Sequence, residues 1–240
     1  PDDEKIREGI LKGIYCLKEG EKGFLNVQLM GSGTVLNEAI AAAEILKKDF
    51  DVDADIWSVP SFTLLAREAR EVERYNRLHP TESTKDTKVK ASKLKIETDE
   101  DIGNIFGHSD SRKTLLSGNS EPEPVLNEPV VVTKTGKVPY VTEQLSNRIG
   151  PFIAATDYIR AFAEQIRAFV PGDYTVLGTD GFGRSDSRAN LRAFFEVDRY
   201  HIAVAALDAL ANQGKIEKSV VLKAIKAFKI DTTSAPSWKR

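Results

Sequence analysis

The sequence is poor in cysteine and histidine. Cys16 is the only cysteine among 240 residues, so the chain can form neither an internal disulfide nor a cysteine-based metal site. One free thiol is typical of a reducing compartment, and the cytoplasm is the expected location. The three histidines, His79, His108 and His201, are too scattered to predict a zinc site. We expect no metal ligands in this chain.

The sequence also lacks a charge imbalance and a long apolar run. Lys and Arg total 34 against 36 Asp and Glu, so no nucleic-acid partner is expected. No apolar stretch approaches the ~20 residues that cross a bilayer, and the acidic start PDDEKIREG is unlike a signal peptide. We expect a soluble protein without a membrane partner. Because it begins at Pro1, we expect a processed product or a piece of a longer protein.

Apolar strands and amphipathic helices alternate along the first third of the chain. Residues 24–30 predict a strand, a Gly-Ser-Gly turn follows at 31–33, and residues 34–50 carry apolar side chains at helical spacing. Residues 52–59 predict a second strand, after which Ser61 is placed to cap a helix. This alternation favours a parallel sheet with helices on both faces, because a crossover helix returns the chain to a parallel neighbour.

The same alternation returns in the second half. Residues 151–156 predict a strand, residues 157–170 a helix capped by Asp157, and residues 174–179 a fourth strand. One face of that helix would carry Ile159, Phe162, Ile166 and Phe169. The sequence therefore predicts an α/β fold, with a three-layer, open and mostly parallel sheet.

Residues 83–137 differ in character from both halves. They are charged or rich in polar residues, Gly and Pro, and no helical period persists. We expect an insertion, flexible or a small added lobe, within an α/β domain made of residues 1–82 and 138–240. Stretches 89–96 and 130–133 could pair as a hairpin, and proteolysis should cut first inside the insertion.

The Gly-Ser-Gly turn at 31–33 is a place where a phosphate could bind, since it lies between a predicted strand and a helix. Asp53 and Asp55 stand about where a ribose-binding acid would be. Leu36 replaces the third glycine of a dinucleotide fingerprint and would hold the helix away from the strand. We therefore favour the interpretation that these glycines are present for backbone geometry alone. Leu36 also weakens a third hypothesis, that the chain is an independent dehydrogenase.

The densest polar cluster is LGTDGFGRSDSRANLR at 177–192, which we expect at the carboxyl edge of the sheet. Its glycines allow positive φ or a close approach, and two arginines could clamp a carboxylate or phosphate. The alternative is that the glycines only shape a turn while Asp186 or Ser187 caps a helix. No nucleophile and base pair is evident. The candidate residues are Asp180, Gly181, Gly183, Arg184, Ser185 and Arg188.

Other distinctive residues are expected to be structural. His79 precedes a proline and would meet the C-terminus of a helix. His201 lies in an amphipathic helix, while Cys16 and Trp57 lie in apolar stretches and are expected in the core.

Three stretches together resemble one known family. They are VQLMGSGTVLNEAIAAAEILKKDFDVDADIWSVPSFTLLAREAREVERYNRLHP, TDYIRAFAEQIRAFVP and YTVLGTDGFGRSDSRANLRAFFEVDRYHIAVAALDALANQGKI. They closely resemble the C-terminal region of the homodimeric pyruvate dehydrogenase first component, a thiamine-diphosphate enzyme of the transketolase superfamily. The resemblance covers residues 4–82 and 138–231, and GTDGFGRSDSR is its most distinctive string.

The resemblance implies the transketolase C-terminal α/β domain. In the complete enzyme, thiamine diphosphate and magnesium would be bound by other domains, pyruvate would be decarboxylated, and the acetyl unit would pass to the lipoyl group of the dihydrolipoyl acetyltransferase. The family's GDG motif has no counterpart, since Gly172-Asp173 is followed by Tyr174. The resemblance thus implies no catalytic, cofactor-binding or metal residue here.

The implied role is structural. The domain would pack against the remaining domains of the same enzyme and contribute to a homodimer, with the 178–188 loop near a domain junction. The residues alone also allow an alternative hypothesis, in which the chain is a free-standing binding or regulatory module that holds an anionic metabolite at this loop. The isolated chain is expected to be inactive toward pyruvate.

Overall fold

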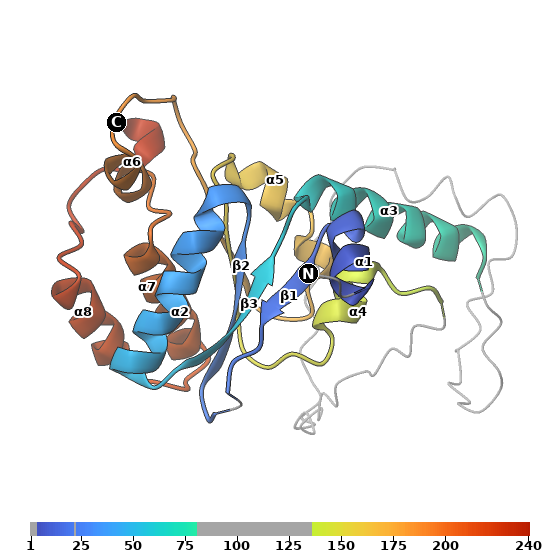
Figure 1. Cartoon of the computed structure of the whole chain (residues 1–240), viewed down its shortest axis with the longest axis horizontal. Helices are drawn as coiled ribbons and strands as arrows, with labels where there is room; N and C mark the ends of the chain where they lie inside the picture. Colours follow the sequence, from blue (N-terminus) through green and yellow to red (C-terminus); the bar gives the residue numbers. More distant parts are fainter. Residues whose placement is uncertain (1–3, 22, 81–135) are drawn as a thin grey trace, which may run out of the picture. The chain divides into compact units, whose positions relative to one another are not determined.

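A computed structural model describes residues 4–21, 23–80 and 136–240 (Figure 1). The chain divides into two compact units, and these residues belong to the one made of residues 1–80 and 136–240. The predicted insertion at 83–137 therefore lies almost entirely outside the described residues, together with His108 and the predicted hairpin. The proposed domain division stays a prediction.

The described unit is built on a five-stranded, mostly parallel sheet. The strands are β1 (Tyr15–Lys18), β2 (Asn26–Gly31), β3 (Asp53–Ser58), β4 (Phe152–Ala155) and β5 (Tyr174–Leu177). Their order is β1-β3-β2-β4-β5, with β2 parallel to both β3 and β4, and β4 parallel to β5. This confirms the expected open sheet. The antiparallel edge strand β1 was not expected, because four residues are too few to show an alternating pattern.

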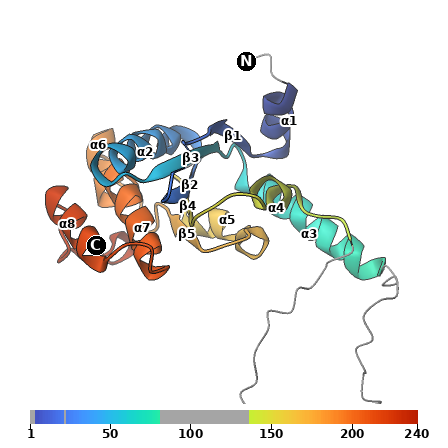
Figure 2. The same cartoon turned by 90° about the horizontal axis from the view of Figure 1, so that it is seen from below.

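Helices cover both faces of the sheet. They are α1 (Glu4–Lys12), α2 (Leu36–Phe50), α3 (Phe62–Leu78), α4 (Tyr140–Leu145), α5 (Arg160–Glu164), α6 (Arg188–Phe194), α7 (Arg199–Asn212) and α8 (Lys218–Ala227), with short 3-10 turns η1 (Gly33–Val35), η3 (Arg167–Phe169) and η4 (Ser237–Lys239). Figures 1 and 2 show α2, α7 and α8 on one side, away from α3 and α4. The three-layer architecture is thus confirmed.

Alternate side chains of β2 pack into two separate hydrophobic clusters, one on each face of the sheet. Val27 and Leu29 pack with α2 and α7, whereas Met30 packs with Trp57 and the α3 side chains. This alternation follows from the two-residue period of a strand, and it explains why the apolar run over 24–30 is nearly continuous. The expected core position of Trp57 is confirmed, and Cys16 is half-buried against the same cluster.

The helix predicted over 157–170 is wrong in its extent. The chain forms only α5, whose N-cap is Ile159, and then η3, so Asp157 caps nothing. Ile159 is 46% exposed and Phe162 39% exposed, so the predicted face is not buried as a unit. The cause is tertiary: the Tyr158 carbonyl accepts a hydrogen bond from the Thr179 N–H, which ties this segment to the loop after β5.

Both ends of α3 match their predictions. The Ser61 hydroxyl accepts a hydrogen bond from the Leu64 N–H at 3.1 Å and caps the helix. His79 closes it, with Nδ1 2.9 Å from the Tyr75 carbonyl oxygen and its ring stacked on Tyr75. Among the described residues, none of the helices is both long and apolar enough to span a membrane.

Candidate functional site at the carboxyl edge of the sheet

The parallel strands end at one edge, where the topology marks a switch point. From β2 the chain crosses to β3 on one side, and β4 later pairs on the other side. Ligands of open α/β sheets bind in the crevice between strands whose connections run in opposite directions. The segments that follow β2, β4 and β5 therefore form the first place to look for a site, and α5 and α6 lie at this end of the sheet (Figure 1).

A cavity of about 340 Å³ lies at this switch point. Thr34 and Val35 line it after β2, Asp157 after β4 and Thr179 after β5. The rest of its wall comes from the β5 loop, α6 and the chain beyond it, namely Gly181, Gly183, Arg184, Arg188, Leu191, Arg192, Phe195 and Val197. Four of the six predicted site residues are thus brought together: Gly181, Gly183, Arg184 and Arg188.

Beside the cavity, one buried carboxylate is shared between two arginines. Glu38 Oε1 lies 2.5 Å from Arg192 Nη1, and Glu38 Oε2 lies 2.9 Å from Arg199 Nε. Burial opposes ionisation of Glu38, but the hydrogen bonds from Arg199 hold the pKa of its carboxyl below the ordinary value. One carboxylate cannot neutralise two guanidinium groups, so positive charge remains beside the cavity.

Asp180 and Gly181 have structural roles. The Asp180 carboxylate accepts hydrogen bonds from the Arg160 N–H, at 2.9 Å, and from its guanidinium, and the Asp180 carbonyl accepts one from Ser237 Oγ. Gly181 has φ +108°, and a Cβ there would lie 3.0 Å from Trp238 Cα. The expected close approach is confirmed at Gly181. It is wrong at Gly183, whose φ is not positive and whose Cβ would meet nothing within 4 Å.

The two predicted arginines line the cavity from α6 and the loop before it. Arg184 Cζ lies 4.4 Å from the centroid of the Phe194 ring, a cation–π contact, and Arg188 is the first residue of α6. Ser187 caps α6 by accepting a hydrogen bond from the Asn190 N–H, as the alternative interpretation predicted. Capping and cavity lining therefore coexist, and Ser185 is exposed outside the cavity wall.

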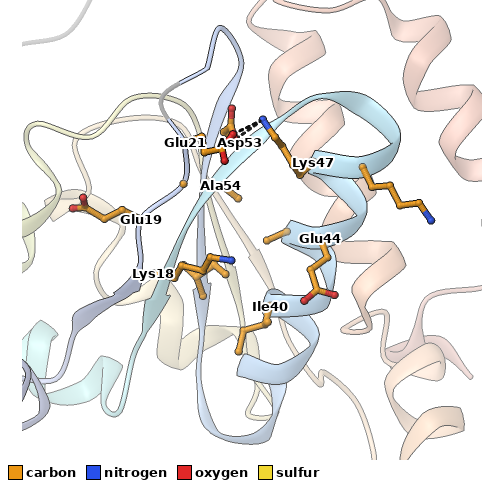
Figure 3. Close-up of a pocket in the computed structure, with 12 residues that line it drawn as sticks. Lys18, Glu19, Glu21, Ile40, Glu44, Lys47, Asp53 and Ala54 are labelled. Atoms are coloured by element: carbon orange, nitrogen blue, oxygen red, sulfur yellow. Dashed lines mark ion pairs between the residues drawn. The ribbon is translucent and has the colours of Figure 1, made fainter. Parts of the chain in front are cut away.

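Asp53 and Asp55 do not serve the glycine turn. Asp53 begins β3, so it lies at the opposite edge of the sheet, where Lys47 Nζ binds its Oδ1 at 3.0 Å (Figure 3). Asp55 Oδ2 lies 3.3 Å from Arg148 Nη1. Neither carboxylate therefore lies where a ribose-binding acid beside the glycine turn would have to be. The groove beside Asp53, about 480 Å³, is lined by three lysines and four acidic side chains, so its charges nearly cancel.

The comparisons with known proteins agree with the α/β fold of the described unit. The chain belongs to a transketolase-related family: residues 13–198 match the model described as "Transketolase-like TK C-terminal domain". It is 42% identical over 228 residues to the pyruvate dehydrogenase E1 component of Cupriavidus necator, covering 94% of this chain and 20% of the relative.

The chain also matches a second curated relative and a solved structure. The pyruvate dehydrogenase E1 component of Pseudomonas aeruginosa is 43% identical over 226 residues, which are 93% of this chain and 20% of the relative. This chain also matches the solved transketolase from Leishmania mexicana, with 12% identity and a TM-score of 0.43, over 85% of this chain and 19% of that chain. The chain spans about a fifth of the length of the curated relatives it matches.

Proposed function

We propose that this chain is the C-terminal, supporting domain of a pyruvate dehydrogenase of the E1 type. The observation that carries the proposal is the 42% identity to such a protein over 94% of this chain but only 20% of the relative. The complete enzyme would decarboxylate pyruvate and pass the acetyl unit to a lipoyl group on the dihydrolipoyl acetyltransferase. We place it in the cytoplasm as a homodimer.

Thiamine diphosphate and magnesium would be held elsewhere in the complete enzyme. Within the described ranges, no group of three or more His, Cys, Asp or Glu residues could hold a metal ion. A magnesium ion that carries a diphosphate needs oxygen ligands from carboxylates or amides. The described residues do not fit this cofactor.

The carboxyl edge offers a surface for the remaining domains. Four exposed aromatic side chains form what we call the aromatic rim: Tyr158 (63% exposed), Phe162 (39%), Phe182 (91%) and Trp238 (51%). Such a concentration of exposed aromatic side chains is typical of interaction sites. Because about four-fifths of the relatives' length has no counterpart here, the occupant we propose is the rest of the same enzyme.

Contacts between three chain segments hold three of the four rim side chains, Tyr158, Phe162 and Trp238. Tyr158 and Phe162 meet edge to face, with ring centroids 5.7 Å apart. The Arg160 guanidinium lies between Asp180, which it binds, and the Trp238 ring, with Cζ 4.7 Å from the centroid. A preformed surface loses less side-chain entropy on docking than a mobile one, which suits a permanent junction.

A chimera tests the proposal. The region of the Pseudomonas aeruginosa relative that this chain matches is replaced by the present sequence, and release of carbon dioxide from pyruvate is measured with thiamine diphosphate and magnesium. We expect an active chimera, and no carbon dioxide from the 240-residue chain under the same conditions. A chimera that folds and remains inactive, or an isolated chain that decarboxylates pyruvate, would contradict the proposal.

Two matched substitutions in the chimera test the junction. Tyr158→Asp places a charge on the aromatic rim, whereas Leu222→Asp places one on α8 at nearly the same exposure, 63% against 67%. A charge buried in an interface without a partner is costly, so only Tyr158→Asp should reduce activity and assembly. Equal effects of the two substitutions would argue against a junction at the rim.

A further inference from the structure

The cavity at the switch point contains charged side chains that lack partners. Arg188 and the Asp157 carboxylate both line it, and neither makes an ion pair or side-chain hydrogen bond within the described part of the chain. The Arg184 guanidinium rests on the Phe194 ring, which leaves its N–H groups available for an anion. Three arginines therefore share the cavity with one carboxylate.

The third arginine is fixed rather than mobile. Arg192 Nη2 donates to the Thr34 carbonyl at 3.1 Å while Nη1 binds Glu38, and its side chain is only 15% exposed. This guanidinium presents a preorganised charge at the cavity wall. Because Glu38 also binds Arg199, the positive charge of Arg192 is only partly neutralised.

The remaining wall is apolar. Val35, Leu191, Phe195 and Val197 line it, and Val197 is fully buried. A volume of about 340 Å³ lies at the lower end of the range of small-molecule sites, which begins at about 300 Å³. An apolar wall with few convergent polar groups is typical of such sites.

We propose that this cavity binds a small phosphate monoester that also carries a hydroxyl group. Three guanidinium groups favour a dianion over a monoanion such as a carboxylate, and guanidinium N–H groups bind phosphate oxygens in pairs. The Asp157 carboxylate repels the phosphate but accepts a hydrogen bond from a hydroxyl group. The ligand is therefore oriented with its phosphate at the arginines and its hydroxyl at Asp157.

Calorimetric titration of the 240-residue chain tests this site with three probes: glycerol 3-phosphate, methyl phosphate and glycerate. Glycerol 3-phosphate should bind most tightly, since methyl phosphate lacks the hydroxyl and glycerate lacks the dianion. Arg184→Ala and Arg188→Ala should each weaken its binding about tenfold, the loss expected for a charged hydrogen bond. Both arginines are exposed, so these variants should fold, which circular dichroism verifies.

Two more variants complete the test. Arg74→Ala removes another exposed arginine, which lines a separate hollow beside α3, and should leave the affinity for glycerol 3-phosphate unchanged. Asp157→Ala should strengthen methyl phosphate binding and abolish the preference for glycerol 3-phosphate. The proposal is overturned if neither ester saturates the chain, if glycerate binds as tightly, or if Arg74→Ala costs as much as Arg188→Ala. These outcomes concern this chain's own residues and are independent of the chimera.

Discussion

Leu36 packs directly on Gly31: its Cα lies 2.5 Å from the position that a Cβ on Gly31 would occupy. Gly31 ends β2 and Leu36 begins α2, so this contact sets how closely the helix approaches the sheet. The expectation that Leu36 would hold the helix away is wrong, because the space comes from the missing side chain of Gly31. The same close entry places Thr34 and Val35 in the cavity wall.

We expect Gly31→Ala to destabilise the chain by about 3 kcal/mol, the upper end of the cost of overpacking a core. The obstacle is backbone, which moves less readily than a side chain, and Gly31 is buried. Urea unfolding measures the change in free energy. Gly183→Ala is the matched control, since its Cβ meets nothing within 4 Å, and it should stay within about 0.5 kcal/mol of the parent chain. Equal stability of the two variants would contradict the contact.

The fold was predictable where one local pattern decided the outcome. Four strands and the α3 cap at Ser61 follow from apolar runs and from a short polar side chain before a helix. The helix predicted over 157–170 failed because the distant loop after β5 hydrogen-bonds to Tyr158. No local pattern contains that contact.

The site was only partly predictable for a related reason. Arg184 and Arg188 stood out because the 177–192 string is dense in polar residues, whereas Asp157 was interpreted as a cap and Thr34 was overlooked. One signal was available: Glu38 sits in a helix that is otherwise apolar on its buried face, and a buried acid needs a basic partner. Which arginines form ion pairs with Glu38 depends on the tertiary fold, which brings Arg192 and Arg199 to it.

A second prediction concerns the buried side chain of Gln28. Its Oε1 accepts a hydrogen bond from Trp57 Nε1 at 2.8 Å, and its Nε2 donates to the Ile149 carbonyl at 3.0 Å. Gln28→Leu should cost about 2 kcal/mol, because it leaves the buried indole N–H without a partner. The double variant with Trp57→Phe should cost less than the sum of the single changes, since both partners are then removed. Strict additivity in urea unfolding would sink this account.

The Glu38 network makes stability depend on pH. The pKa of the Glu38 carboxyl is held below the ordinary value. Its contribution to the free energy of unfolding is therefore complete above about pH 4.3, the pKa in the unfolded chain, and is lost as the pH falls through the folded pKa. Glu38→Gln should cost about 2 to 3 kcal/mol at pH 7, less than a fully buried pair because Arg199 is partly exposed. The difference from the parent chain should shrink below about pH 4. Glu44→Gln, exposed on the same helix, should change stability little at any pH.

The single thiol gives a direct test of the β1 edge. Burial raises the pKa of Cys16 to about 11, despite the opposing charge of Arg148. At pH 8 the folded chain should therefore react with iodoacetamide more than about a hundredfold more slowly than the chain unfolded in urea, whose thiol has a pKa of about 8.5. The folded rate should keep rising with pH beyond pH 9, where that of the unfolded chain levels off. Because Cys16 is the only cysteine, intact mass reports this one site. Equal rates at pH 8 would mean that Cys16 is not packed against the core as β1 requires.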